Sequence, residues 1–513
     1  MTSPPSAVSA RGRWMTLTAA LLGWMFDGLE MGLFPLVARP ALIDLLGTTS
    51  QTEIGQWIAI ITAGFLVGAA TGGVLFGWLG DRIGRVRAMT LSILTYAVFS
   101  GLCGLASEAW QVAGLRFIAS LGMGGEWSLG IALVMEVWPD RSRGWLAGVI
   151  GGAANFGYLI IGVVGLALSH LIQDLHSAML SVGVGPETAD WLVKNSGWRI
   201  LMLFGAVPAL LTFLIRLFVP ESNRWEAERA RGATSHWQSV DLLGVVIGAA
   251  AAAGLIALWA VPDVPPVVRF AGSAVAFAVV TAGYLFPIVR YVLRATLAAH
   301  PTEPDGEIGP DVQGVVQGTT AWFIGRLLLA AALSGVALLG TWGATQQAPT
   351  WADQLKPGTD ARTYTQMSTA FGAIIGCVAA ALAGHRFGRR ITYAVLCVGS
   401  LASIAGFYHL NTEYGPTFLL TAFVMGTITA AFYGWLPLYL PELFPTRIRA
   451  TGQGFGFNFG RVLAAVGVLQ LPHVMKEFDV GWPGACTAMS LVYLAGLGLI
   501  WLAPETKGKA LPS

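Results

Sequence analysis

Apolar residues run along this chain in long stretches that are separated by short polar segments. Most stretches hold about 20 residues, the length that an α-helix needs to cross the hydrocarbon core of a membrane. Fourteen such stretches predict an all-α polytopic membrane protein with 14 transmembrane helices. The predicted spans are 14–36, 55–79, 88–106, 110–136, 144–170, 197–219, 240–261, 267–292, 323–348, 366–385, 391–409, 416–440, 451–472 and 483–503.

The composition agrees with a membrane protein. The 513 residues are 55% hydrophobic and 11% charged, whereas charged residues make up about 25% of a soluble domain. The net charge of +2 does not indicate a nucleic-acid partner, so we expect a lipid bilayer and a small molecule as partners. The four cysteines lie within apolar spans and lack metal-ligand spacing. We therefore expect neither a metal nor a cofactor.

The distribution of Lys and Arg predicts the orientation, because short cytoplasmic loops carry an excess of basic residues. If the N-terminus is cytoplasmic, 19 of the 30 basic residues fall in the inner segments and six in the outer ones. An even number of spans then places both termini in the cytoplasm. We expect a monomeric, multi-pass protein of the plasma membrane, with the bacterial inner membrane as its location.

Several motifs occur twice along the chain. "MEVWPDRSRG" ends the fourth span and "PELFPTRIRA" ends the twelfth, while "GDRIGR" follows the second span and "GHRFGR" follows the tenth. These repeats predict two pseudo-symmetric six-helix halves, 14–222 and 323–506. Between them we expect an extra transmembrane hairpin, 240–292, at the periphery, and a cytoplasmic linker, 293–322. Repeated halves are typical of transporters, whose substrate site lies where the halves meet.

The loop "GWLGDRIGRVRA" (77–88) resembles the signature loop of the major facilitator superfamily, and a degenerate copy carries His385 in place of Asp81. "PESNRW" and "PETKGKAL" are similar to the ends of the two halves in sugar-porter and metabolite:proton symporter branches. "RFIASLGMGGEW" in the fourth span resembles organic-acid:proton symporters, and the extra hairpin resembles the sialate branch. The resemblance implies alternating-access symport of protons with a small organic anion, such as a sialic, aromatic or other carboxylic acid.

Two other transport functions stay open, a proton-coupled sugar or polyol porter and a drug/proton antiporter. "QQAP" (346–349) lacks the Ser-Gly-x-Asn that follows Gln-Gln in hexose porters, which weakens a hexose substrate. A receptor that binds without translocating is a further, less favoured alternative. The sequence contains no convincing catalytic constellation and no "GxxxxGK[ST]" phosphate loop, so we expect neither an enzyme nor ATP-driven transport.

Two acids, Asp27 and Glu30, lie in the middle of the first span and share one helix face. A charged acid near the bilayer centre costs roughly 2.5–3.5 kcal/mol on insertion scales, so such residues point to a function. We expect Asp27 and Glu30 to carry protons. The resemblance to sugar porters pairs Arg116 of the fourth span with the acid at Asp27. A static salt bridge is the alternative.

Arg461 lies within the eleventh helix of the two halves and is the expected anchor for a substrate carboxylate, because the guanidinium fork matches a carboxylate. Glu126 lies in the middle of the fourth span, where it would contact the substrate or a proton. Amide and aromatic side chains could orient a polar ligand, although packing alone also explains each of them. The predicted substrate-binding residues are Glu126, Arg461, Asn155, Asn458, Gln346, Gln347, Tyr433 and Trp342.

A further set of charged residues lies at the cytoplasmic ends of the predicted helices. Ion pairs among them are expected to hold the inner ends of the two halves together, and their breaking would let the protein open inward. The predicted cytoplasmic gate consists of Asp81, Arg82, Arg85, Glu136, Arg141, Arg143, Glu442, Arg447 and Arg449.

Overall fold

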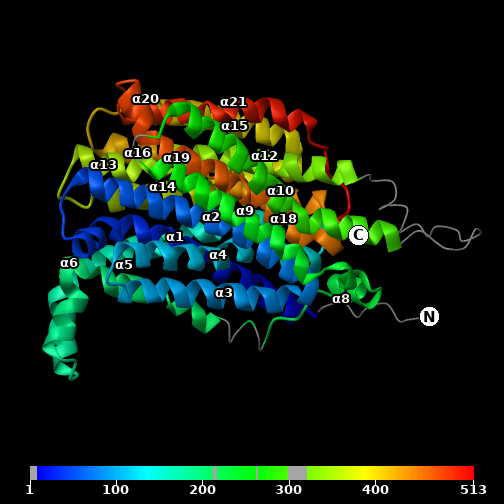
Figure 1. The fold of residues 1–513 in the computed structure, drawn as a ribbon, viewed down its shortest axis with the longest axis horizontal. Coiled ribbons are helices and arrows are strands. Elements are labelled where there is room, and N and C mark those ends of the chain that lie inside the picture. The colour runs from blue at the N-terminus through cyan, green and yellow to red at the C-terminus, as the bar shows by residue number, and fades with distance from the viewer. Residues whose placement is uncertain (1–8, 212–214, 216–217, 262–263, 299–319, 513) are drawn as a thin grey trace, which may run out of the picture.

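The computed structural model describes residues 9–211, 215, 218–261, 264–298 and 320–512. Within these ranges the regular secondary structure is entirely helical. The helices lie side by side in an elongated bundle (Figure 1). Most of the predicted linker 293–322 lies outside the described residues, and the predicted boundaries of the two halves stay predictions.

The helices of the first part of the chain are α1 (Ala10–Leu46), α2 (Gln51–Ile83), α3 (Arg85–Leu102), α4 (Ala109–Val137), α5 (Arg143–Ser181) and α6 (Pro186–Phe204). The middle of the chain forms α8 (Asn223–Ala230), α9 (Leu242–Ala260) and α10 (Pro266–Ala298). The last part forms α12 (Thr320–Gly343), η6 (Thr345–Gln347), α13 (Ala348–Leu355), α14 (Ala361–Phe387), α15 (Arg389–Leu410), α16 (Pro416–Thr429), α17 (Phe432–Tyr439), α18 (Arg449–Asn458), α19 (Gly460–Glu477), α20 (Trp482–Ser490) and α21 (Val492–Leu499).

Twelve helical segments of the described chain are long and apolar enough to cross a membrane. They coincide with 12 of the predicted spans. The two other predicted spans, 14–36 and 197–219, are not among them. The first lies inside α1, where two acids interrupt the apolar residues, and the second includes positions outside the described ranges. The prediction of fourteen spans therefore stays a prediction.

Close contact between α1 and α5 positions the side chains near the middle of both helices. A Cβ on Gly28 would lie 1.7 Å from the carbonyl oxygen of Ala154, and a Cβ on Gly157 would lie 1.9 Å from that of Met25. Only glycine allows two helix backbones to approach this closely, as is common between membrane helices. The contact brings Asp27 of α1 beside Asn155 and the following turn of α5.

The hairpin of α9 and α10 packs against α2 on one side and against α12, α18 and α19 on the other. The hydroxyl groups of Thr71 in α2 and Tyr284 in α10 lie 2.6 Å apart. The rings of Phe277 and Tyr284 pack against Phe459, at the junction of α18 and α19. One face of the hairpin therefore covers the seam between the two predicted halves, and the expectation of a peripheral hairpin stays a prediction.

Both ends of the described chain lie at the same end of the bundle (Figure 1). The indole N–H of Trp138, which follows α4, donates to the carbonyl of Arg13 near the start of α1. Arg449, at the start of α18, donates to the carbonyl of Pro512. This shared end also holds the charged residues that the repeated motifs supply.

Candidate functional site

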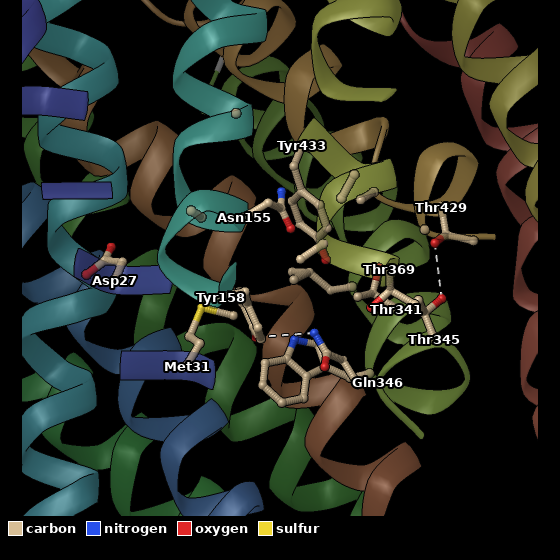
Figure 2. Close-up of a pocket in the computed structure, with 18 of the residues that line it drawn as sticks. Asp27, Met31, Asn155, Tyr158, Thr341, Thr345, Gln346, Thr369, Thr429 and Tyr433 are labelled. Atoms are coloured by element: carbon tan, nitrogen blue, oxygen red, sulfur yellow. Dashed lines mark hydrogen bonds between the residues drawn. The ribbon is translucent and has the colours of Figure 1, made fainter. Parts of the chain in front are cut away.

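A pocket lies between α1, α4 and α5 on one side and α12, η6, α14, α16, α17, α18 and α19 on the other. The space between its lining atoms is about 910 Å³, including the part that is open to solvent. Figure 2 shows side chains from both sides converging on it. Of the predicted site residues, those that line the pocket are Asp27, Asn155, Trp342, Gln346, Tyr433 and Arg461. Those that do not line it are Glu30, Arg116, Glu126, Gln347 and Asn458.

Arg461 is the cation of the pocket wall. Its side chain comes from the first turn of α19, directly after the break between α18 and α19, and the residue is only 4% exposed. Its guanidinium carbon lies 5.5 Å from the ring centre of Phe457. Within the described part of the chain, its buried Nε and Nη1 atoms have no hydrogen-bond partner. Buried guanidinium nitrogens without partners are costly, so the site suits an anionic ligand.

Asp27 is the acid of the pocket wall and is 6% exposed. Among the described residues, nothing donates a hydrogen bond to its Oδ1 atom. Its charge interacts with Arg461 and with a second buried acid, Glu126. The guanidinium of Arg461 therefore both lines the pocket and interacts electrostatically with Asp27.

Glu126 lies behind the pocket wall, between α4 and α1, and is 1% exposed. A Cβ on Gly23 would lie 1.6 Å from its Oε1 atom, so the carboxyl group packs directly on the α1 backbone, one turn before Asp27. The groups that act on this carboxyl are the side chains of Asp27 and Tyr96. Glu126 was expected to bind substrate, but this position faces Asp27 and Tyr96 rather than the pocket.

Arg116 pairs with Glu30 rather than with Asp27. Its Nη1 atom lies 2.8 Å from Glu30 Oε1, and both side chains are 2% exposed. The hydroxyl of Ser100 donates to the other oxygen, Glu30 Oε2. The expected pairing with Asp27 is therefore wrong in this structure. Asp27 and Glu30 are separated by nearly one helical turn. Helices α1 and α4 run in opposite directions, because Glu126 of α4 contacts Gly23, which precedes both acids on α1. Arg116, which precedes Glu126 on α4, therefore lies level with Glu30, the later of the two acids.

Two other predicted ligand residues are engaged in structural hydrogen bonds. Asn458 donates to the carbonyls of Gly124 (2.9 Å) and Gly454 (3.1 Å), which ties α18 to α4. Gln347 donates to the carbonyl of Trp342 at 2.8 Å and stabilises the end of α12. These contacts explain why neither amide lines the pocket.

The prediction missed Tyr158, which links the two sides of the pocket. Gln346 of η6 donates to the hydroxyl of Tyr158 on α5 at 3.2 Å (Figure 2). A signal for Tyr158 was present, because it follows Asn155 by three residues and so shares its helix face. The other uncharged polar residues that line the pocket are Thr341, Thr345, Gln366, Thr369 and Thr429. None of these stands out from the packing residues around it in the sequence.

Aromatic rings form much of the remaining pocket wall. The rings of Trp127 and Phe457 stack with centres 3.7 Å apart and planes 7° apart. Trp24 and Trp342 also line the pocket. These rings offer flat apolar faces in the same pocket as Arg461 and Asp27, an arrangement that suits a flat organic acid.

A network of charged residues lies at the end of the bundle where the two chain ends meet. Arg85 Nη1 lies 2.5 Å from Asp81 Oδ1 and Arg85 Nη2 lies 3.4 Å from Glu136 Oε1. The backbone N–H of Arg85 donates to Glu221, and the hydroxyl of Ser222 donates to Glu136. Burial raises the pKa of the Glu221 carboxyl, which lies outside the membrane spans.

The same arrangement occurs a second time. Arg389 Nη2 lies 2.6 Å from Glu442 Oε1, its backbone N–H donates to Glu505, and the hydroxyl of Thr506 donates to Glu442. Burial opposes ionisation of Glu505, but the backbone N–H groups of Arg389 and Arg390 lower its pKa overall. Sequence reasoning omitted Arg389 from the gate, although it occupies the position of Arg85 in the repeated motif.

Several contacts join these two clusters across the predicted halves. Arg449 lies 2.9 Å from Glu136, Arg143 lies 3.7 Å from Glu442, and the backbone N–H of Thr451 donates to an oxygen of Asp81 at 2.8 Å. We call this set the charged network; it consists of Asp81, Arg85, Glu136, Arg143, Arg389, Glu442, Arg449 and Thr451.

The remaining predicted gate residues lie outside the charged network. Arg82 donates to the hydroxyl of Ser239, just before α9. Arg141 and Arg447 form no ion pair within the described ranges. The three side chains are therefore not part of the contacts that join the predicted halves.

Two family models match consecutive parts of the chain. The model described as "Sugar (and other) transporter" matches residues 17–237, and the model described as "Major Facilitator Superfamily" matches residues 222–468. The chain belongs to the major facilitator superfamily of transporters. It is a multi-pass membrane protein, and its family and relatives are transporters rather than enzymes.

The relatives include two proteins of Acinetobacter baylyi. The cis,cis-muconate transport protein is 25% identical over 464 residues, which cover 90% of this chain and 87% of that protein. The niacin transporter NiaP is 24% identical over 501 residues, covering 96% and 94%. The proton:xylose symporter XylE, solved with 6-bromo-6-deoxy-D-glucose, shares the fold with a TM-score of 0.66 at 18% identity and 98% coverage of both chains.

Proposed function

We propose that this protein is a proton-coupled symporter that carries a small organic anion by alternating access. The observation that carries the proposal is Arg461, a buried guanidinium in the pocket wall with two nitrogen atoms that lack partners in the described chain. A carboxylate can satisfy such a group through charge-assisted hydrogen bonds. The sialic, aromatic and other carboxylic acids all carry that group.

Among these acids, the pocket favours flat, unsaturated ones. The stacked rings of Trp127 and Phe457 and the ring of Trp342 offer flat surfaces beside Arg461. The names of the two relatives from Acinetobacter baylyi refer to muconate and niacin, which are both unsaturated carboxylic acids. A flat acid would place its carboxylate on Arg461 and its conjugated body against these rings.

Proton coupling would arise because Asp27 and the substrate carboxylate interact with the same cation, Arg461. Arg461 is the cation that acts on Asp27. When a substrate carboxylate binds Arg461, the positive charge is neutralised, and a buried Asp27 then favours its protonated form. Proton and anion would enter together. Glu126 lies one turn away and is a second acid that could hold the proton, whereas Glu30 and Arg116 form an ion pair that supports α1.

The charged network supports a cytoplasmic gate. Its ion pairs join helices of the two predicted six-helix halves, and breaking them would let those halves part at this end. We further propose that this end faces the cytoplasm, that both termini lie there, and that the protein spans the bacterial inner membrane fourteen times as a monomer. The positive-inside distribution of Lys and Arg supports this orientation.

Uptake by proteoliposomes tests the function. Purified protein is reconstituted and given labelled muconate, nicotinate, benzoate, a sialic acid and xylose, with and without an inward proton gradient. We expect one of the acids to accumulate above its external concentration only with the gradient, and a protonophore to abolish accumulation. Accumulation of an acid that ignores both the gradient and the protonophore would contradict symport.

A proton-coupled sugar or polyol porter is the second candidate, with a drug/proton antiporter behind it. The amides of Gln346 and Gln366 and the threonine hydroxyls in the pocket are groups that hydrogen-bond neutral polyols. The Arg461→Gln variant separates the candidates, because it removes the anchor of an acid but leaves the amide and hydroxyl groups. Xylose uptake that survives this change, in a protein that takes up none of the acids, would favour the porter.

A further inference from the structure

The last residues of the described chain fold back over the charged network. After α21, the hydroxyl of Tyr439 donates to the carbonyl of Pro504 at 2.8 Å, which anchors the start of this segment. A turn follows, in which the backbone N–H of Lys509 donates to the carbonyl of Thr506 at 3.0 Å. Gly508 completes the turn with a φ of +76°, a conformation that favours glycine. The turn sends the chain back toward the seam between the predicted halves.

The carbonyl groups of this segment bind two arginines of the charged network. Arg143 Nη1 donates to the carbonyl of Lys509 at 3.3 Å, and Arg449 Nη2 donates to the carbonyl of Pro512 at 2.5 Å. Arg143 lies at the start of α5 and Arg449 at the start of α18, on opposite sides of the seam. A short length of backbone is therefore hydrogen-bonded to both sides.

The same two arginines form the ion pairs that cross the seam, from Arg143 to Glu442 and from Arg449 to Glu136. Between the two carbonyls, Leu511 is only 7% exposed and belongs to the hydrophobic core. Its burial anchors the segment by an apolar contact that is independent of the charges. In contrast, the side chains of Lys507 and Lys509 are exposed.

We propose that residues 508–512 form a strap that helps to hold the charged end of the transporter closed. In the closed state the strap supplies two carbonyl acceptors to arginines whose acidic partners lie across the seam. If the halves part at this end, Arg143 moves away from Arg449, and one segment cannot remain bonded to both. Opening then requires the strap to leave at least one arginine, so the strap raises the population of the closed state.

The test changes the strap without touching the arginines or acids. Gly508→Val disfavours the positive φ of the turn. A Cβ atom at this position would meet nothing within 4 Å, so the substitution acts through the backbone conformation. Leu511→Ala removes the apolar anchor. Lys509→Ala is the matched control, because it removes an exposed side chain and keeps the carbonyl that binds Arg143.

Opening is measured as a distance across the seam in the full-length protein. Spin labels on cysteines introduced at Arg87 and Arg386, both exposed at this end, report the distance by double electron–electron resonance. The four native cysteines are buried and do not compete for the label. Neither substrate nor a proton gradient is needed, so an error in the proposed substrate or coupling leaves this measurement valid. Thermal unfolding of each variant checks that it is folded.

We expect Gly508→Val and Leu511→Ala to raise the ratio of open to closed molecules roughly tenfold, the effect of losing about one charge-assisted hydrogen bond. The Lys509→Ala distribution should match that of the unmodified protein. Distances in both strap variants that equal the unmodified distribution would overturn the proposal. An equal opening in Lys509→Ala would also overturn it, since the lysine side chain and not the backbone would then hold the gate.

Discussion

The guanidinium of Arg116 lies 2.8 Å from a carboxyl oxygen of Glu30, and both side chains are buried between α1 and α4. Ser100 donates to the second oxygen of Glu30, so this acid has a partner on each oxygen. Asp27, nearly one turn earlier on α1, has an oxygen without a partner in the described chain and lines the pocket. The two acids of the first helix therefore differ in their surroundings, and we expect them to differ in role.

Removing one member of the Glu30–Arg116 pair should destabilise the fold. Arg116→Gln leaves a buried carboxylate without its cation, which typically costs about 3–5 kcal/mol. We expect a clear fall in the thermal unfolding temperature of Arg116→Gln and of Glu30→Gln in detergent. The double variant, Glu30→Gln with Arg116→Gln, should recover part of the loss because no buried charge remains unpaired.

Asp27→Asn is the matched control for that experiment, since it changes an acid of the same helix that forms no ion pair with any described residue. Its unfolding temperature should stay near that of the unmodified protein. A fall as large as that of Arg116→Gln would contradict the division of the two acids.

The anchor role of Arg461 predicts a loss of acid binding in Arg461→Gln. The loss of charge-assisted hydrogen bonds should weaken binding at least tenfold. Arg461→Lys keeps the charge but loses the planar fork, so we expect an intermediate affinity. Isothermal titration of the acid identified by the uptake screen measures both effects. The control Arg386→Gln removes an exposed arginine outside the pocket, and an equal loss there would remove the specific role of Arg461.

The coupling role of Asp27 predicts that Asp27→Asn separates binding from accumulation. We expect gradient-driven accumulation to fall to the equilibrium level, whereas counterflow exchange of the labelled acid continues because the pocket keeps Arg461. Glu126→Gln should reduce accumulation more than it reduces binding, since Glu126 does not line the pocket. Accumulation by Asp27→Asn at the unmodified level would exclude Asp27 as the coupling acid.

The contact between the hairpin and α2 predicts a stability effect without a binding effect. Tyr284→Phe removes one hydroxyl from the pair with Thr71 and should lower the free energy of unfolding by about 1 kcal/mol. Substrate affinity should be unchanged, because no residue of α9 or α10 lines the pocket. A changed affinity in a stably folded Tyr284→Phe protein would mean that the hairpin acts on the site through α2.

The superfamily fold was predictable because its signals are local and repeated. The loop that holds Asp81 and Arg85 has a second copy around Arg389, and the structure builds matching contacts at both, including the acids Glu136 and Glu442. Intramembrane charge likewise pointed to Arg461 and Asp27, because a charge in an apolar helix is costly without a function. Both lie in the pocket wall.

The details that escaped prediction depend on contacts between distant helices. The spacing of Asp27 and Glu30 puts them on one face, but it does not say which acid lies level with Arg116 on another helix. Tyr158 and Gln366 carry no charge, so in sequence they look like packing residues of a membrane helix. The contact of the hairpin with both predicted halves was hidden for a related reason, because an apolar surface that faces protein resembles one that faces lipid.

The covered seam has a consequence for molecules that dissolve in the bilayer. Thr71, Tyr284 and Phe459 are buried where α9 and α10 cover the junction of α2 and α19, so that flank offers no sideways passage toward the pocket. The opposite junction, between α5 and α14, carries no such cover in the described chain. A lipophilic, protonated acid that partitions into the membrane would therefore approach the pocket only from the side of α5 and α14. Inhibitors that act from the lipid phase should be sought against this uncovered flank.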